Sequence, residues 1–488
     1  MDSFIFNHDY ILRHDEKRTF LVQKNHNNDS SRSWISVIHP IQAMILSFFS
    51  ESKQYDKVIE EISFFLEISK EDTIRMIKPF IENSETFYTK HDNQEFKFPK
   101  NVLIKTSSNK SPIRRYLVEQ FTFKELDFVS KRFYSGPLNI TLMPTNICST
   151  NCMYCYADKS YKIKNYLSLE RIKEILDEAN DLNVMSFEIV GGEVFKHPEW
   201  EKILQYYVDK GFDPRRISTK VPLSKDDIIK LKKIGINKIQ ISLDTLIEKN
   251  LSYILKTNKK YYDQILESIK LLDEENIDIK IQTILTKYNC TKEDMLSIFN
   301  YIKTFKNVNG WAIRPAFTSI YNGNDFVPSL SQINEVFNSV EPLKSEIKNI
   351  DYDRTFLDRG YMSIEGGSEN FKGAECSSNR SHIFILPDGK VTICEQLYWK
   401  PNFIIGDIST HTIKEIWNSE RSLFLYNLKK SDLSDHNPCK TCEIFDSCYK
   451  NMNRCWAEVV KAYGDENWDY PDPRCKMAPK MKTNLIYQ

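Results

Sequence analysis

Between Leu138 and Phe317, apolar strand-like runs alternate with amphipathic runs of helical period, and this alternation limits the fold more than any other feature. It predicts parallel strands covered by helices. The six expected strands are Leu138–Met143, Ser186–Val190, Arg216–Thr219, Lys238–Leu243, Asp278–Thr286 and Trp311–Arg314. The intervening helices are expected at Leu169–Asn180, Trp200–Lys210, Asp226–Ile234, Tyr262–Leu272 and Lys292–Phe305. Because a closed TIM barrel has eight strands, the predicted fold class is α/β with a partial (β/α)6 barrel, and chemistry is expected at the carboxyl ends of its strands.

The first hundred residues show a different pattern. Short strand-like pieces precede three runs of helical spacing at 41–49, 55–66 and 73–81. A strand pair, Phe87–Thr89 and Glu95–Phe98, follows and can form a β wing. Strands, helices and a wing together predict a separate winged-helix-like domain.

The domain organisation follows from these patterns and from the polar stretch Ser107–Pro112. We expect a winged-helix-like domain at 1–105, a linker at 106–136, the partial barrel at 137–330, connecting helices at 331–370 and a cysteine-rich domain at 371–488.

The eleven cysteines are unevenly distributed, with three at 148–155, seven at 376–475 and Cys290 alone. The start of the chain has no signal-peptide pattern and no apolar run is long enough to span a bilayer, so a cytoplasmic location is expected. A reducing compartment disfavours structural disulfides, and clustered thiols there indicate metal. Cys290 is expected to be a buried apolar thiol.

Cys148, Cys152 and Cys155 directly follow the first predicted barrel strand, at the catalytic end. Three thiols without a fourth nearby would leave one iron of a four-iron cubane open to a small molecule. A structural zinc site is the alternative, although such sites usually pair two-cysteine knuckles and complete four protein ligands.

This CxxxCxxC spacing resembles the radical S-adenosylmethionine (SAM) superfamily, and the resemblance covers the barrel. It implies that the three cysteines hold a 4Fe–4S cluster whose open iron binds SAM. It also implies reductive cleavage of SAM to a 5′-deoxyadenosyl radical that abstracts hydrogen from the substrate. By the same resemblance, residues at successive strand ends contact SAM: Gly191, Gly192, Glu193, Ser218, Lys220, Ser242 and Asp244. Taken singly, these short matches are also compatible with ordinary loop chemistry.

The later cysteines begin with Cys376 and with Cys394, which follows a Pro-Asp-Gly-Lys turn typical of a β-hairpin. The arrangement resembles the SPASM extension of radical SAM enzymes, which implies two auxiliary 4Fe–4S clusters and three clusters in all. The implied outer-cluster ligands are Cys439, Cys442, Cys448 and Cys475, and the implied inner-cluster ligands are Cys376, Cys394 and Cys455, with a fourth unassigned. The six residues between Cys448 and Cys455 depart from the family's usual three and put Cys455 in doubt. A zinc ribbon is the alternative for this region, and His382 is either a further ligand or a residue with a surface or core role.

Balanced charge, with 67 basic and 67 acidic residues, argues against a nucleic-acid or membrane partner. SPASM enzymes include maturases of ribosomally synthesised peptides, and the winged-helix-like pattern resembles the domain with which such maturases bind a leader peptide as an added strand. The implied partners are a precursor peptide and a reductant such as flavodoxin or ferredoxin.

The expected reaction is an intramolecular thioether or carbon–carbon cross-link. Either is a net two-electron oxidation, and auxiliary clusters provide a route for the second electron. Peptide epimerisation and sulfatase-type formylglycine formation are the enzymatic alternatives, and no catalytic base is assigned. The non-enzymatic alternative is a metal-binding scaffold or a winged-helix nucleic-acid-binding module.

Overall fold

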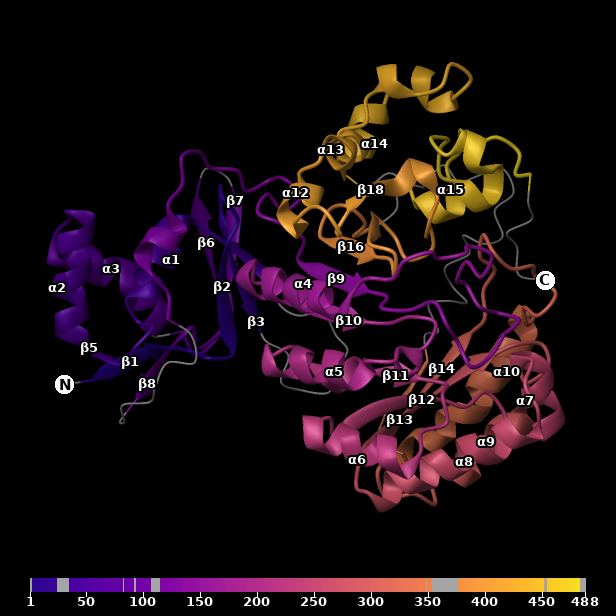
Figure 1. Cartoon of the computed structure of the whole chain (residues 1–488). Helices are drawn as coiled ribbons and strands as arrows, with labels where there is room; N and C mark the ends of the chain where they lie inside the picture. Colours follow the sequence, from indigo (N-terminus) through magenta and orange to yellow (C-terminus); the bar gives the residue numbers. More distant parts are fainter. Residues whose placement is uncertain are drawn as a thin grey trace. The chain divides into compact units, whose positions relative to one another are not determined.

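The structure is a computed structural model that describes residues 2–23, 35–81, 83–91, 94–106, 115–347, 349–352, 376–451 and 454–482. The chain divides into two compact units, residues 1–136 and 137–488 (Figure 1). The expected linker stretch Ser107–Pro112 lies outside the described residues. Within the described ranges, no helix combines the length and the apolar character needed to cross a bilayer.

Unit 1 contains three small sheets and three helices. Its elements are β1 (Ser3–Phe6), β2 (Tyr10–His14), β3 (Thr19–Gln23), β4 (Ile35–Ile38), α1 (Pro40–Ser47), β5 (Lys53–Gln54), α2 (Tyr55–Leu66), α3 (Lys70–Ile81), β6 (Phe87–His91), β7 (Gln94–Phe98) and β8 (Leu103–Thr106). The sheets are β5–β1–β8, β2–β3–β4 and the β6–β7 hairpin, all antiparallel. The three helical runs and the strand pair of the wing therefore form where the sequence pattern places them.

Residues 115–136, which the sequence pattern assigns to a linker, pack onto unit 1. Tyr116 and Phe121 are 8% and 1% exposed and belong to its apolar core. The Tyr116 hydroxyl accepts a hydrogen bond from the Leu12 amide at 3.1 Å. The buried Arg18 guanidinium donates to the Arg132 carbonyl at 2.9 Å and pairs with the buried Asp15 carboxylate at 3.1 Å. The aromatic side chains of this segment complete the core, so the segment is part of the domain.

Unit 2 contains two five-stranded sheets. The first has the order β10 (Ser186–Ile189), β9 (Asn139–Leu142), β16 (His382–Ile385), β17 (Lys390–Thr392) and β18 (Ile404–Asp407). Strands β10, β9 and β16 are parallel, whereas β16, β17 and β18 form an antiparallel meander. The second sheet is entirely parallel, in the order β11 (Ser218–Thr219), β12 (Lys238–Ser242), β13 (Asp278–Leu285), β14 (Val308–Pro315) and β15 (Ile350–Asp351).

All six expected barrel strands form, but they do not form one continuous wall. Among the described strands, no ladder joins β10 to β11, which is only two residues long and pairs with β12 alone. Pro214 starts a 3-10 turn, Pro214–Arg216, where the sequence pattern begins the strand. On the other side of β9, strand β16 from the cysteine-rich region supplies a parallel neighbour. The barrel and the cysteine-rich region thus share a sheet.

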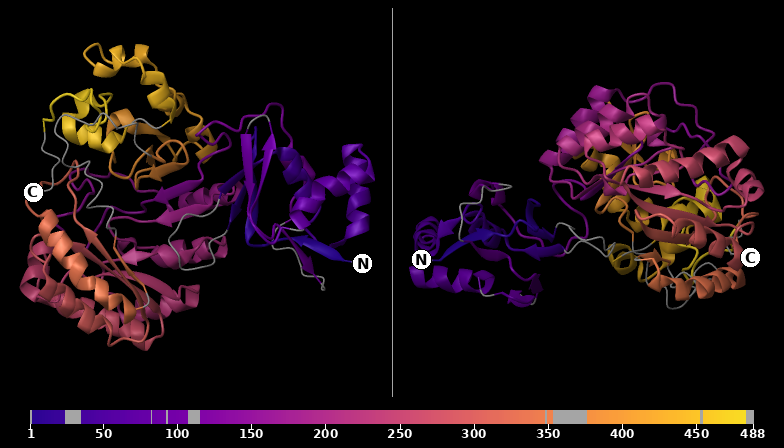
Figure 2. Two further views of the ribbon diagram at one scale, coloured as in Figure 1. Left: turned by 180° about the vertical axis from the view of Figure 1, so that it is seen from behind. Right: turned by 90° about the horizontal axis from the view of Figure 1, so that it is seen from below.

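Helices cover the sheets from outside, as the views from behind and below show for α4, α5, α6, α8 and α9 (Figure 2). The helices are α4 (Leu169–Asp181), α5 (Trp200–Asp209), α6 (Lys225–Ile234), α7 (Glu248–Leu255), α8 (Lys259–Glu274), α9 (Lys292–Ile302), α10 (Leu330–Val340), α12 (Ile413–Trp417), α13 (Glu420–Tyr426), α14 (Phe445–Asn451) and α15 (Trp456–Tyr463). Ser168, Ser224 and Thr291 begin α4, α6 and α9 by accepting backbone hydrogen bonds of the first turn. The sequence pattern did not indicate α7.

The packing of residues 115–136 predicts how shortening one of their side chains changes the stability of unit 1. Phe121→Ala should destabilise unit 1 by about 3–5 kcal/mol, because it removes a fully buried aromatic ring and leaves a cavity. Denaturant unfolding followed by circular dichroism measures the loss. The neighbouring Leu117→Ala, at a side chain that is 53% exposed, is the matched control and should change stability by less than about 0.5 kcal/mol. Equal small effects from both variants would show that this segment is only a linker.

Candidate functional site

The loop that follows β9 carries Cys148, Cys152 and Cys155, and helix α7 fixes its position. The Asn151 and Met153 amides donate to the carbonyls of Leu255 and Ile254, at the end of α7, at 2.9 and 3.0 Å. The loop is thereby tied to a helix that follows β12 along the chain. The three cysteines lie at the carboxyl end of β9, the edge at which barrel chemistry is expected.

The three thiols differ in exposure but share polar neighbours. Cys148 is exposed, Cys152 is buried and Cys155 is half-buried. The Thr150 hydroxyl lies 3.5 Å from the Cys148 sulfur and 3.2 Å from the Cys152 sulfur. Burial raises the pKa of Cys152 to about 11, and the nearby Lys220 ammonium acts in the opposite direction. A buried thiol of this kind gives up its proton when a metal binds the sulfur.

Gly191 and Gly192 bring the end of β10 against the cysteine loop. The Gly192 amide donates to the Thr145 carbonyl at 2.9 Å. A Cβ atom at position 192 would lie 2.3 Å from the Ile147 carbonyl oxygen, and one at 191 would lie 2.9 Å from the Thr145 carbonyl oxygen. Glycine is needed here because the two backbones touch.

Glu193 links the two sheets that no ladder joins. Its carboxylate is only 6% exposed and accepts hydrogen bonds from the Thr219 hydroxyl at 2.6 Å and the Lys220 amide at 2.7 Å. Burial raises the pKa of Glu193, and these two donors oppose the rise. A carboxylate has further lone pairs, so Glu193 can also accept from an ammonium group.

Asp244, just after the end of β12, holds the cysteine loop in place through a contact with Tyr154. It is 1% exposed and accepts from the Tyr154 hydroxyl at 2.5 Å and the Ile284 amide at 2.9 Å. The Lys220 ammonium lies 5.5 Å from the centre of the Tyr154 ring. Burial raises the pKa of Asp244, and the Lys220 charge opposes the rise. Asp244 therefore has a positioning role that the sequence resemblance did not indicate.

The strand-end residues proposed to contact SAM gather around the cysteine loop. Lys220 interacts electrostatically with Asp244, Cys152, Glu193 and Cys148, the largest of these effects being that of Asp244. Ser218 pairs with Gln240 on β12, and Ser242 stands two residues further along the same strand. Ser218 and Ser242 therefore lie on the same face of the sheet, and Ser242 is two residues closer to the carboxyl end of the strands.

The later cysteines form two groups. We call Cys439, Cys442, Cys448 and Cys475 the outer group; the Cys439 thiol interacts electrostatically with the other three. We call Cys376, Cys394 and Cys455 the inner group; the Cys455 thiol interacts with Cys376 and Cys394. Burial raises the pKa of Cys439 to about 11 and that of Cys394 to about 12. These are the two sets that the SPASM resemblance implies.

The donor chemistry of the three cysteine sets is thiol only, which suits iron–sulfur clusters. In the described residues, no three His, Cys, Asp or Glu side chains already converge at single-ion distances. His382 lies on β16, and its Nε2 is 2.9 Å from the Thr141 hydroxyl. Burial lowers the pKa of His382 to about 4, and its hydrogen-bonding partner, Thr141, lies on the neighbouring strand β9. Cys290 is 3% exposed, as expected of a buried thiol.

Sequence reasoning missed several supports of the cysteine loop. The Lys159 ammonium donates to the Cys152 carbonyl at 3.0 Å, and the Asn322 amide group donates to the Cys155 carbonyl at 3.2 Å. Neither residue has a fixed spacing from the motif that could have identified it. Tyr154 could have been identified from the sequence, because it lies inside the CxxxCxxC motif.

Comparison with known proteins identifies two domains. The family model of the radical SAM superfamily matches residues 142–302, and that of SPASM, an iron-sulfur cluster-binding domain, matches residues 376–443. These matches confirm both resemblances inferred from the cysteine spacings and favour iron–sulfur over zinc.

Two curated relatives and one solved structure align with much of the chain. The antilisterial bacteriocin subtilosin biosynthesis protein AlbA of Bacillus subtilis is 25% identical over 65% of this chain and 68% of its own length. The PqqA peptide cyclase of Bradyrhizobium diazoefficiens is 22% identical over 71% of this chain and 88% of its own. The crystal structure of Streptococcus suis SuiB bound to precursor peptide SuiA covers 98% of this chain and 100% of that chain, with a TM-score of 0.63 and 16% identity. At that identity the likeness to SuiB shows a shared fold.

The contact of the Gly191–Gly192 backbone with the cysteine loop predicts a sharp steric effect. Gly192→Ala should displace residues 146–147 and lower SAM cleavage at least tenfold, because the new methyl group would overlap the Ile147 carbonyl. The formation of 5′-deoxyadenosine under dithionite measures it. Gly323→Ala, at a position with open space around the Cβ, is the control and should keep full cleavage. Equal rates in the two variants would contradict the close approach.

Proposed function

We propose that this chain, an enzyme with radical SAM and SPASM domains, modifies a ribosomally synthesised precursor peptide and joins two of its residues by a thioether or carbon–carbon bond. The observation that carries the proposal is the combination of a SAM-type cysteine loop, two further thiol groups and a separate N-terminal unit in one chain. The names of two relatives point the same way, one to bacteriocin biosynthesis and the other to peptide cyclisation. SuiB, which shares the fold, was crystallised with a precursor peptide.

The residues around Cys148, Cys152 and Cys155 fit the role of holding a 4Fe–4S cluster and SAM. When bound, that pair supplies a 5′-deoxyadenosyl radical, and the hard chemistry belongs to the cofactor. The Lys220 ammonium favours the thiolate form of Cys152. Glu193 holds Lys220 through its backbone amide and has acceptor capacity left for the SAM ammonium. A flavodoxin or ferredoxin is the proposed electron donor.

The two later thiol groups support an oxidative reaction. Forming one cross-link removes two hydrogen atoms from the peptide. The deoxyadenosyl radical takes the first, and the second leaves as a proton and an electron. We assign the inner and outer groups, each as ligands of one 4Fe–4S cluster, to the acceptance of that electron.

Unit 1 provides strand edges that suit a leader peptide. On edge strand β2, the Tyr10 and Leu12 amides are already bound, by the Asn7 carbonyl at 3.0 Å and the Tyr116 hydroxyl at 3.1 Å. The leader is therefore assigned to another edge of unit 1, where the described edge strands besides β2 are β4, β5, β6, β7 and β8. An added strand gains affinity from backbone hydrogen bonds and specificity from alternating side chains.

Replacing Cys148, Cys152 and Cys155 together with Ala should abolish SAM cleavage and remove about four iron atoms per chain. The later thiol groups lie in another part of unit 2 and should keep their iron. Iron analysis and 5′-deoxyadenosine assays after anaerobic reconstitution measure both effects. Cys290→Ala, outside all three sets, should retain iron and activity. Continued cleavage by the triple variant would refute the site, and a colourless, zinc-containing wild type would refute the clusters.

Deleting residues 1–136 should weaken binding of the precursor peptide encoded beside the gene at least tenfold, about 1.4 kcal/mol. SAM cleavage without peptide should continue, because the cysteine loop belongs entirely to unit 2. The cut at 136 is preferred to one at 105, which would leave Tyr116 and Phe121 without their core. Calorimetry measures the affinity. Equal affinity of the deleted and intact chains would remove the leader-binding role and favour small-molecule or sulfatase-type substrates.

A further inference from the structure

Arg454 lies between the inner and outer thiol groups. It directly precedes Cys455 of the inner group in the sequence. Its Nη2 lies 3.8 Å from the sulfur of Cys439 in the outer group. The side chain is buried, with a residue exposure of 3%. The guanidinium thus adjoins the outer group, and the Arg454 backbone leads directly into the inner group at Cys455.

The contacts of Arg454 hold the guanidinium in place without neutralising it. Its Nη1 donates to the backbone carbonyls of Asp469 and Tyr470, the latter at 2.8 Å. The guanidinium carbon lies 5.1 Å from the centre of the Trp456 ring. Among the described residues, the Nε atom has no hydrogen-bond partner, and the ion pairs within the same ranges do not include Arg454.

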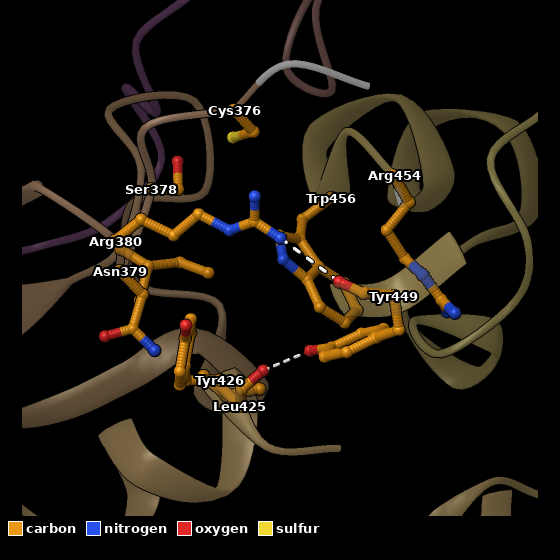
Figure 3. Close-up of a pocket in the computed structure, with 10 residues that line it drawn as sticks. Cys376, Ser378, Asn379, Arg380, Leu425, Tyr426, Tyr449, Arg454 and Trp456 are labelled. Carbon is orange, nitrogen blue, oxygen red and sulfur yellow. Dashed lines mark hydrogen bonds between the residues drawn. The ribbon is translucent and has the colours of Figure 1, made fainter. Parts of the chain in front are cut away.

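Cys376 of the inner group and Arg454 line the same pocket (Figure 3). It has an empty volume of about 390 Å³. Tyr449 lines it and closes one side by donating from its hydroxyl to the Leu425 carbonyl. Arg380 crosses it and donates to the Tyr449 carbonyl at 3.2 Å. The pocket lining therefore contains aromatic and basic side chains and no carboxylate. Besides the thiolates, the buried anion near Arg454 is the Asp472 carboxylate, which accepts from the Cys455 amide at 2.8 Å and is paired with Arg474 at 2.7 Å.

A buried guanidinium keeps its proton and is costly unless an anion is near. The Arg454 Nη2 lies 3.8 Å from the Cys439 sulfur, so its positive charge acts directly on the outer thiol group. Four thiolates around a cubane carry about two net negative charges in the oxidised state and about three after one-electron reduction. The buried cation stabilises the more negative state more strongly.

We propose that Arg454 is a positioning residue that raises the reduction potential of the outer cluster, so that an electron leaving the peptide is drawn from the inner thiol group to the outer one. Each reduction of the outer cluster transfers one electron and no proton. The inference rests on the proposed ligand sets for the two auxiliary clusters. It assigns a direction to the electron path that those ligand sets alone do not give.

The test is a redox titration of the anaerobically reconstituted full chain, followed by electron paramagnetic resonance. The signal that Cys442→Ala loses identifies the outer cluster. Arg454→Gln should lower the equilibrium constant for reducing that cluster at least tenfold, which for one electron is about 59 mV. Arg454→Lys, which keeps the charge but not the planar fork, should restore part of the difference.

Arg421→Gln is the matched control. Arg421 belongs to the same region, and its guanidinium lies 5.5 Å from the centre of the Trp468 ring and 5.1 Å from that of Phe424, away from the thiols. Its replacement should leave the outer potential unchanged. A shift as large as that of Arg454→Gln would overturn the inference, because a general loss of packing would then explain both.

Iron counts separate failure of the inference from failure of the ligand sets. If Cys442→Ala keeps as much iron as the wild type, the outer ligand set is wrong and the inference falls with it. If Cys442→Ala loses about four irons while Arg454→Gln keeps the wild-type potential, only the inference is overturned. If Arg454→Gln and Arg454→Lys both lose the cluster, Arg454 serves assembly, which also overturns the proposed control of potential.

Discussion

The two hydrogen bonds to Glu193 hold together sheets that share no strand ladder. β11 is too short to pair with β10, and the Glu193 carboxylate bridges the gap by accepting from Thr219 and Lys220. The same contact fixes the backbone from which the Lys220 ammonium reaches towards the cysteine loop. Loss of this carboxylate would remove a direct contact between the sheets and free the backbone of Lys220. One buried side chain therefore contributes to both the architecture and the electrostatics of the site.

Burial, and not surface charge, determines the strength of the electrostatic interactions in the site. Asp244, Glu193 and Lys220 are held near one another and near buried thiols, where a charge interacts more strongly than in water. Arg454 is a further buried cation, beside the outer thiol group. The balanced net charge of the whole chain conceals this local separation. The cysteine loop and the outer group thus each have a basic residue nearby.

Much of the fold and of the site could be predicted from the sequence, because period and spacing are local signals. The six strands and the cysteine loop follow such signals, whereas the composition of both later thiol groups is what the SPASM resemblance implies. What the sequence could not show depends on distant partners. Helix α7 is short and its amphipathic pattern is brief, yet its last carbonyls hold Asn151 and Met153. The sequence pattern assigns residues 115–136 to a linker because they follow the polar stretch Ser107–Pro112, and their contacts with Leu12 and Arg18 make them part of the domain.

The pairing of β16 with β9 has a consequence for how the chain folds. The hydrogen bond between Thr141 and His382 joins residues 241 positions apart, so one edge of β9 stays uncovered until most of the chain has left the ribosome. Contacts of such long sequence separation form slowly, and an open strand edge favours aggregation meanwhile. The strand that covers this edge lies between Cys376 and Cys394, so the core would close only as the inner thiols arrive. Expression at low temperature with slow translation, or with chaperones that shield strand edges, is the corresponding route to soluble protein.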